Sequence, residues 1–146
     1  RAGDGLWITG PVGAAMLGLE ALRAGSGDSL AYRRPIALLA EGQALAPHVS
    51  AMMDVSDGLL LDARRMAEAS GVTIAIERMA VPIATPEARR DEALAWGEDY
   101  QLLFTAPAEA QLPVAAQRIG MVIAGGAEPL LLDGIPPAGK LGYEHG

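Results

Sequence analysis

Two short carboxylate clusters stand where secondary-structure elements are expected to meet. The first is Asp54-Val55-Ser56-Asp57-Gly58, at the end of an expected strand and the start of an expected helix. Alternation along the strand puts Asp54 and Ser56 on one face, and the turn lets Asp57 swing towards the same space. Carboxylates this close repel each other unless a cation or a proton lies between them.

Oxygen ligands of this kind select Mg²⁺ or Ca²⁺, and the helix start offers free N–H groups to a phosphate. The cluster therefore predicts a magnesium–phosphate site that uses Asp54, Ser56 and Asp57. The plain alternative is that Ser56 or Asp57 only caps the helix and that Asp54 is solvated.

The second cluster is Trp96-Gly97-Glu98-Asp99-Tyr100, at an expected helix exit into a strand. Adjacent Glu98 and Asp99 point in different directions once the strand begins, so one can face a ligand while the other is structural. The alternative is an acidic turn without a ligand. A third segment, Thr9-Gly10-Pro11-Val12-Gly13, lacks both the lysine of a P-loop and the glycine spacing of a Rossmann turn, and indicates a Gly-Pro turn into a helix.

Composition limits the kinds of chemistry that are open to the chain. It has 146 residues, the size of one domain, and 51% of them are apolar, which is enough for a core. There is no cysteine, and histidine occurs only at positions 48 and 145, so thiolate sites and a histidine metal cage are excluded. A net charge of −7 argues against nucleic acid or an anionic membrane as partner. The sequence also lacks an apolar run long enough for a spanning helix, and we expect a cytoplasmic protein.

Helices and strands are interleaved without a strict βαβ rhythm. Helices are expected over Val12–Ala24, from Pro35 towards Ala46, over Leu59–Ser70 and over Pro86–Trp96. Strands are expected over Gly5–Gly10, Ser50–Ser56, Val72–Glu77, Asp99–Thr105, Arg118–Ala124 and Pro129–Asp133. Because the last three strands have only short connections, the pattern predicts an α+β fold with a mixed sheet packed with helices.

The helix over Leu59–Ser70 has the clearest pattern. Its apolar stripe and the glycine that ends it, Gly71, are typical of a surface helix. We expect Asp62 on its polar face, together with three other charged residues, Arg64, Arg65 and Glu68. Ile36, Leu39 and Leu45 of the helix after Pro35 are expected in the core.

The order and spacing of these segments resemble the C-terminal half of bacterial thiamine-monophosphate kinases. The motifs that carry the resemblance are Asp54-Val55-Ser56-Asp57-Gly58-Leu59, Ala69-Ser70-Gly71-Val72 and Gly97-Glu98-Asp99-Tyr100. The resemblance implies the C-terminal domain of the aminoimidazole ribonucleotide synthetase-like type over residues 1–146, as one substrate- and metal-binding domain. It also implies an N-terminal ATP-binding domain that this chain lacks, and dimerisation through that domain.

The activity implied by the resemblance is transfer of the γ-phosphate of ATP to thiamine monophosphate, with Mg²⁺. Asp54 and Asp57 would ligate Mg²⁺, Ser56 would contact ATP and Glu98 would bind the thiamine substrate. Tyr143, in Gly142-Tyr143-Glu144-His145, matches the aromatic tail motif of the family and would pack on the thiamine rings. Two positions depart from the family pattern: Trp96 stands where a glycine is usual, and Gly146 where a large apolar residue is usual.

Two other readings of the sequence stay open. One is a domain of a sibling ATP-dependent synthetase, of the aminoimidazole ribonucleotide, selenophosphate or hydrogenase-maturation type. The other is a module without enzymatic activity that binds a nucleotide or packs on a partner. Because phosphoryl transfer depends on complete metal positioning, the 146-residue chain alone is expected to be inactive.

Overall fold

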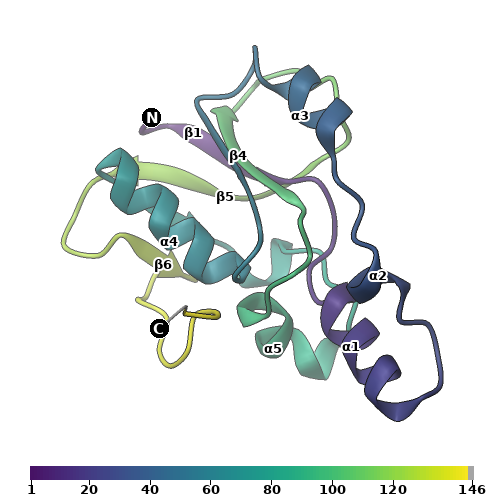
Figure 1. Cartoon of the computed structure of the whole chain (residues 1–146). Helices are drawn as coiled ribbons and strands as arrows, with labels where there is room; N and C mark the ends of the chain where they lie inside the picture. The colour runs from purple at the N-terminus through teal and green to yellow at the C-terminus, as the bar shows by residue number, and fades with distance from the viewer. Residues whose placement is uncertain (145–146) are drawn as a thin grey trace.

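Six strands form a single mixed sheet in the computed structural model, which describes residues 1–144 (Figure 1). The strands are β1 (Asp4–Ile8), β2 (Ala51–Asp54), β3 (Val72–Ile76), β4 (Leu102–Pro107), β5 (Gln117–Ala124) and β6 (Leu130–Leu132). Their order across the sheet is β2-β4-β1-β5-β3-β6. All neighbours are antiparallel except β3 and β6, which are parallel. The α+β fold with a mixed sheet is therefore confirmed.

Five α-helices accompany the sheet within residues 1–144: α1 (Ala14–Ala24), α2 (Leu30–Arg33), α3 (Leu39–Leu45), α4 (Leu59–Ser70) and α5 (Arg90–Ala95). α4 has the limits that its sequence predicts, and Gly71 ends it in the left-handed conformation at φ 63°. Figure 1 shows α4 lying along the sheet, while α1, α2 and α5 gather beyond one end of the strands. In this same stretch, none of the helices combines the length and the apolar character needed to cross a bilayer.

The core has two parts because side chains alternate along each strand. Leu6, Ile8 and Leu103 point to the face that α4 covers, and they belong to the larger cluster of buried residues. Phe104 points to the opposite face, where it packs with Leu45 of α3. The sheet thereby holds the end of β2 and the start of β4 side by side, and both carboxylate clusters lie at that end.

The helix expected from Pro35 towards Ala46 is shorter than predicted. Residues 35–38 have no helical structure, and the helix begins only at Leu39. Leu45 is buried as expected, but Ile36 and Leu39 are exposed to 79% and 74%. The reason is spacing, since Leu39 and Leu45 are six residues apart and so lie on different faces of a helix.

The expectation that Asp62 lies on the polar face of α4 is wrong. Its side chain is fully buried. Asp62 stands three residues after Leu59 and four before Met66, so helical geometry puts it within the apolar stripe whatever its charge. One carboxylate oxygen accepts hydrogen bonds from the backbone N–H groups of Ser56 (3.0 Å) and Asp57 (2.9 Å). Asp62 is thus an internal cap for the loop that precedes its own helix.

This burial predicts an unusual pH dependence of stability. Burial raises the pKa of Asp62 above its ordinary value of 3.8, against the opposing hydrogen bonds from Asp57 and Arg65. A folded state that holds a proton more tightly than the unfolded chain loses stability as the pH rises through that interval. The quantity to follow is the free energy of unfolding of the native chain minus that of Asp62→Asn. We expect this difference to fall as the pH rises from below 3.8 through the raised pKa of Asp62.

Urea unfolding over a pH series measures this difference. The control is Glu109→Gln, which neutralises an exposed carboxylate. A difference between native chain and Asp62→Asn that is constant with pH, or that grows as the pH rises, would contradict the assignment.

Candidate functional site

The two carboxylate clusters are joined backbone to backbone. The N–H of Glu98 donates to the carbonyl oxygen of Ser56 at 2.8 Å, and the N–H of Tyr100 donates to that of Val55 at 2.9 Å. Val55 in turn donates to the carbonyl oxygen of Gln101 at 2.8 Å. These bonds extend the pairing of β2 and β4 beyond the ends of both strands and fix the two clusters relative to each other.

Glycines make this close approach possible. A Cβ on Gly97 would overlap the carbonyl oxygen of Ser56, and one on Gly142 would overlap that of Asp57. A Cβ on Gly58 would lie 2.9 Å from the carbonyl oxygen of Ala95. The backbone around Gly97 and the backbone around Gly142 therefore both pack against residues 56–58. Any residue with a Cβ at position 97 or 142 would prevent this close packing. We call this arrangement the glycine junction.

Glu98 and Asp99 diverge as the sequence predicts, one structural and the other facing a pocket. Glu98 and Tyr100 both have left-handed backbone conformations, with φ of 70° and 52°. This explains why the strand expected from Asp99 begins only at Leu102. Such strained residues gather at functional sites and persist where the surroundings hold them.

Asp99 is the structural member of the pair. Its carboxylate accepts hydrogen bonds from the N–H groups of Gly13 (2.7 Å) and Ala15 (2.9 Å). Burial raises the pKa of Asp99, and the hydrogen bonds from the start of α1 oppose that rise. Because a carboxylate already fills the start of α1, the segment Thr9–Gly13 is a turn into a helix, as its sequence indicates, and it offers no free cradle to a phosphate.

Asp57 forms an ion pair with the guanidinium of Arg65. The same Arg65 nitrogen donates to Asp62 at 3.0 Å. Two carboxylates thus share one cation, which offsets their mutual repulsion beside the glycine junction. No signal in the sequence distinguished Arg65 from its neighbour Arg64, which pairs with Glu68 on the exposed side of the helix.

Four of the five candidate site residues line one pocket of about 280 Å³: Ser56, Asp57, Glu98 and Tyr143. Tyr143 reaches it because its backbone N–H donates to the carbonyl oxygen of Asp57 at 2.8 Å. The tail is therefore fixed to the first cluster through the glycine junction. His145 and Gly146, the remaining tail residues compared with the family pattern, lie outside the described residues.

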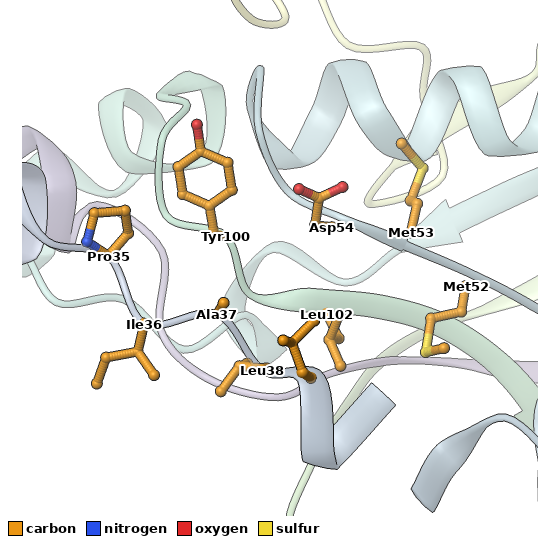
Figure 2. A pocket seen from close by; sticks show the side chains of 10 residues that line it. Pro35, Ile36, Ala37, Leu38, Met52, Met53, Asp54, Tyr100 and Leu102 are labelled. Atoms are coloured by element: carbon orange, nitrogen blue, oxygen red, sulfur yellow. The ribbon is translucent and has the colours of Figure 1, made fainter. Parts of the chain in front are cut away.

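Asp54, the fifth candidate, lies in a neighbouring pocket of about 500 Å³ whose other lining is mostly apolar. Figure 2 shows its carboxylate projecting to the same side as the ring of Tyr100. The Tyr100 hydroxyl donates to Glu98 at 3.1 Å and so connects the two pockets. Burial and this bond to Glu98 raise the pKa of Tyr100, and the charges of Asp54 and Asp57 raise it further. The charges of Asp54 and Asp57 therefore both act on the Tyr100 hydroxyl, although the two aspartates line different pockets.

A complete metal cage is not present in this part of the molecule. Within residues 1–144, no three His, Asp or Glu side chains are grouped closely enough to hold a metal ion. Ser56 and Asp57 line one pocket and Asp54 lines the neighbouring one, so each of these groups can supply only part of a coordination shell. Mg²⁺ commonly uses one or two carboxylates together with phosphate oxygens and water, so this partial set fits that ion.

Sequence reasoning missed two side chains of the 280 Å³ pocket, Tyr32 and Lys140. Tyr32 lies in α2, a helix of four residues with no periodic signal. Lys140 is the single lysine of the chain, and its Nζ lies 5.8 Å from the centroid of the Tyr143 ring. Their positions depend on the fold of distant segments, which local patterns do not encode.

Comparison with known proteins agrees with the resemblance seen in the motifs. The family model of AIR synthase related protein, C-terminal domain, matches residues 1–130. The chain belongs to this family. The AIR synthase related domain is 34% identical to thiamine-monophosphate kinase of Aquifex aeolicus over 99% of its own length and 52% of that protein. It is 32% identical to thiamine-monophosphate kinase of Escherichia coli K12, covering 73% of this chain and 38% of that protein.

Solved structures give the same picture. The domain matches AaThiL complexed with AMPPCP and TMP with a TM-score of 0.84 and 34% identity, covering 99% of this chain and 52% of that one. It matches E. coli HypE with a TM-score of 0.75 at 22% identity, which shows a shared fold. The chain spans about half the length of the relatives that it matches over its full length.

The glycine junction yields a direct prediction. In Gly97→Ala, the new methyl group would overlap the Ser56 carbonyl oxygen, so either the 97–100 segment or the loop after β2 must move. We expect a loss of about 1–3 kcal/mol in the free energy of unfolding, typical of overpacking at a site that cannot yield. Urea unfolding measures this loss.

Gly42→Ala is the matched control, because a Cβ there meets its nearest neighbour at an ordinary 3.7 Å within α3. That variant should gain up to about 1 kcal/mol from helix propensity. Equal stabilities of the two variants would rule out the steric role of Gly97.

Proposed function

We propose that this chain is the C-terminal, substrate- and metal-binding part of an ATP-dependent thiamine-monophosphate kinase. The reaction moves the γ-phosphoryl group of ATP to a phosphate oxygen of thiamine monophosphate. The bond between the γ-phosphorus and its bridging oxygen breaks, a new P–O bond forms, and thiamine diphosphate and ADP leave. The observation that carries the proposal is the meeting of Ser56, Asp57, Glu98 and Tyr143 at one pocket.

Each residue has a role that suits its chemistry. The Ser56 hydroxyl contacts ATP, and the Glu98 carboxylate binds the thiamine moiety, whose thiazolium ring is a cation. The Tyr143 ring, 58% exposed, packs on the thiamine rings. Tyr100 orients Glu98 through the hydrogen bond between its hydroxyl and that carboxylate.

Asp54 and Asp57 would hold Mg²⁺, which when bound neutralises negative charge on the transferred phosphoryl group. The rest of the coordination shell would come from phosphate oxygens, water and groups outside this chain. Arg65 pairs with the Asp57 carboxylate and fixes its position on the side of α4. Asp62 fixes the backbone of Ser56 and Asp57, and thereby the position from which both side chains project.

The proposal includes a second domain that this chain does not contain. An N-terminal domain would supply most of the ATP site and the remaining metal ligands, and full-length protomers would pair through it. The relatives support this division, because the chain covers only 38% to 52% of the two kinases compared above. The HypE match, at 22% identity, supports only the fold, so no observation favours a sibling synthetase.

The division predicts that the chain alone does not catalyse the reaction. Incubated with ATP, Mg²⁺ and thiamine monophosphate, it should form no thiamine diphosphate, because half of the charge-neutralising groups are missing. Chromatography of the products tests this, with the Aquifex aeolicus enzyme as the active control. Turnover by the purified chain would contradict the two-domain division.

Glu98→Gln tests the substrate assignment directly. The change preserves the shape of the side chain and removes its charge, so thiamine monophosphate should bind about tenfold more weakly or worse, as expected for a lost hydrogen bond to a charged group. Isothermal titration of the chain with thiamine monophosphate and Mg²⁺ measures the affinity. Glu109→Gln, at an exposed position outside the pocket, is the control. Equal affinities for native chain and Glu98→Gln would exclude Glu98 from substrate binding.

A further inference from the structure

One of the two proposed metal ligands, Asp57, already has a cation of the protein bound to its carboxylate. Its Oδ2 atom accepts a hydrogen bond from an Nη atom of Arg65, which lies eight residues later on α4. The Asp57 side chain is 14% exposed, so little of it is open to solvent while this ion pair is in place. Asp54, by contrast, is exposed and lines the neighbouring pocket. The two aspartates therefore differ in how readily they can accept a metal ion.

The backbone of Asp57 is fixed on both sides. Its N–H donates to the carboxylate of Asp62 at 2.9 Å, and its carbonyl oxygen accepts from the N–H of Tyr143 at 2.8 Å. Gly142 packs directly on that carbonyl oxygen, since a Cβ there would lie only 2.4 Å from it. What remains free to change is the rotation of the Asp57 side chain, which has a few staggered positions. The carboxylate can thus leave Arg65 and enter the 280 Å³ pocket without a change in the backbone.

Arg65 can release Asp57 at a low cost. The Nη atom that binds Asp57 also donates to Asp62 at 3.0 Å, so the guanidinium keeps one carboxylate partner when it loses the other. Asp62 stays in place, because it accepts hydrogen bonds from the N–H groups of Ser56 and Asp57. The Arg65 side chain is 41% exposed, and water can therefore hydrate the donors that no longer bind Asp57.

A metal ion and Arg65 compete for Asp57. Mg²⁺ binds carboxylate oxygens, and to reach this carboxylate it must either break the ion pair or accept a second positive charge as its neighbour. In both cases it binds more weakly than at a carboxylate without that partner. In the absence of a metal ion, the same positive charge offsets the repulsion between Asp57 and Asp62. Arg65 thus stabilises the fold and opposes the metal with one and the same charge.

We propose that Arg65 is an exchangeable counter-ion, which pairs with Asp57 in the absence of a metal ion and releases it when Mg²⁺ binds. The inference rests on the proposed function, because it takes Asp57 as a metal ligand. Arg65 is then the residue that sets how tightly the site holds its metal. Arg64, its neighbour on the helix, has no such role, because it pairs with Glu68 on the exposed side.

Titration with Mn²⁺ tests the competition on the chain itself. Mn²⁺ accepts the same oxygen ligands as Mg²⁺ and is paramagnetic, so the relaxation rate of water protons reports its binding. In Arg65→Gln, we expect Mn²⁺ to bind about tenfold more tightly than in the native chain, because the competing charge is gone. Arg65→Lys keeps the charge and should stay near the native affinity. Arg64→Gln is the matched control and should bind Mn²⁺ as the native chain does.

A double-mutant cycle assigns the effect to Asp57. Asp57→Asn should bind Mn²⁺ more weakly than the native chain, and in that background Arg65→Gln should lose most of its effect, because there is no ion pair left to break. Thermal unfolding of each variant accompanies the titrations. Gln at position 65 can still donate a hydrogen bond to Asp62. If Arg65→Gln does not fold, Arg65→Gln combined with Asp62→Asn removes the buried carboxylate together with its partner, and the same tightening is expected.

The outcomes separate this inference from the proposed function. Tighter binding in Arg65→Gln that depends on Asp57 supports the exchange. Binding in Arg65→Gln that is equal to or weaker than native, with Asp57→Asn weaker still, overturns the exchange and leaves Asp57 as a metal ligand. Tightening that is as large in Arg65→Lys also overturns it, since the charge would then not be the cause. Equal affinities of the native chain and Asp57→Asn, or no Mn²⁺ binding by any variant, overturn both the exchange and the metal role of Asp57.

Discussion

The whole site depends on how closely three stretches of backbone meet at residues 56–58. The carbonyl oxygens of Ser56 and Asp57 accept hydrogen bonds from Glu98 and Tyr143, at 2.8 Å each. Gly97 and Gly142 remove the side-chain atoms that would keep these stretches apart. Because these contacts involve main chain, the side chains of Ser56, Asp57 and Glu98 line the pocket rather than hold the three stretches together. The polar side chains of the site can come together only because Gly97 and Gly142 have no Cβ.

A division of labour among the acidic residues follows from this constraint. Asp62 and Asp99 have structural roles, since each accepts hydrogen bonds from two backbone N–H groups. Asp54, Asp57 and Glu98 keep at least part of their surface towards a pocket. The buried carboxylates are costly on their own, and the amides that they cap offset that cost. The acidic composition of the chain therefore serves both architecture and ligand binding.

Sequence patterns were sufficient where local periodicity decides the outcome. α4 has the predicted limits, and the mixed sheet follows from short connections between its last strands. Sequence patterns do not predict the conformation of a segment that is set by contacts with residues far away in the sequence. The carboxylate of Asp99 accepts hydrogen bonds from the start of α1, and the flanking residues Glu98 and Tyr100 have left-handed conformations that no strand contains. Asp62 was misassigned because residue type was weighed above its place on the helical wheel. Tyr32 and Lys140 carried no local signal for the pocket that they line.

The strand order also governs how the chain reaches its native state. β1 is the third strand across the sheet, yet its two partners, β4 and β5, lie about a hundred residues later along the chain. Loop closure over such separations is entropically expensive, and folds dominated by it form slowly. The backbone hydrogen bonds on both edges of β1 can form only after residue 121 has been synthesised, because Met121 is the last residue of β5 that pairs with β1. Helix α4 and β3, which are adjacent in sequence, are the part that can assemble first.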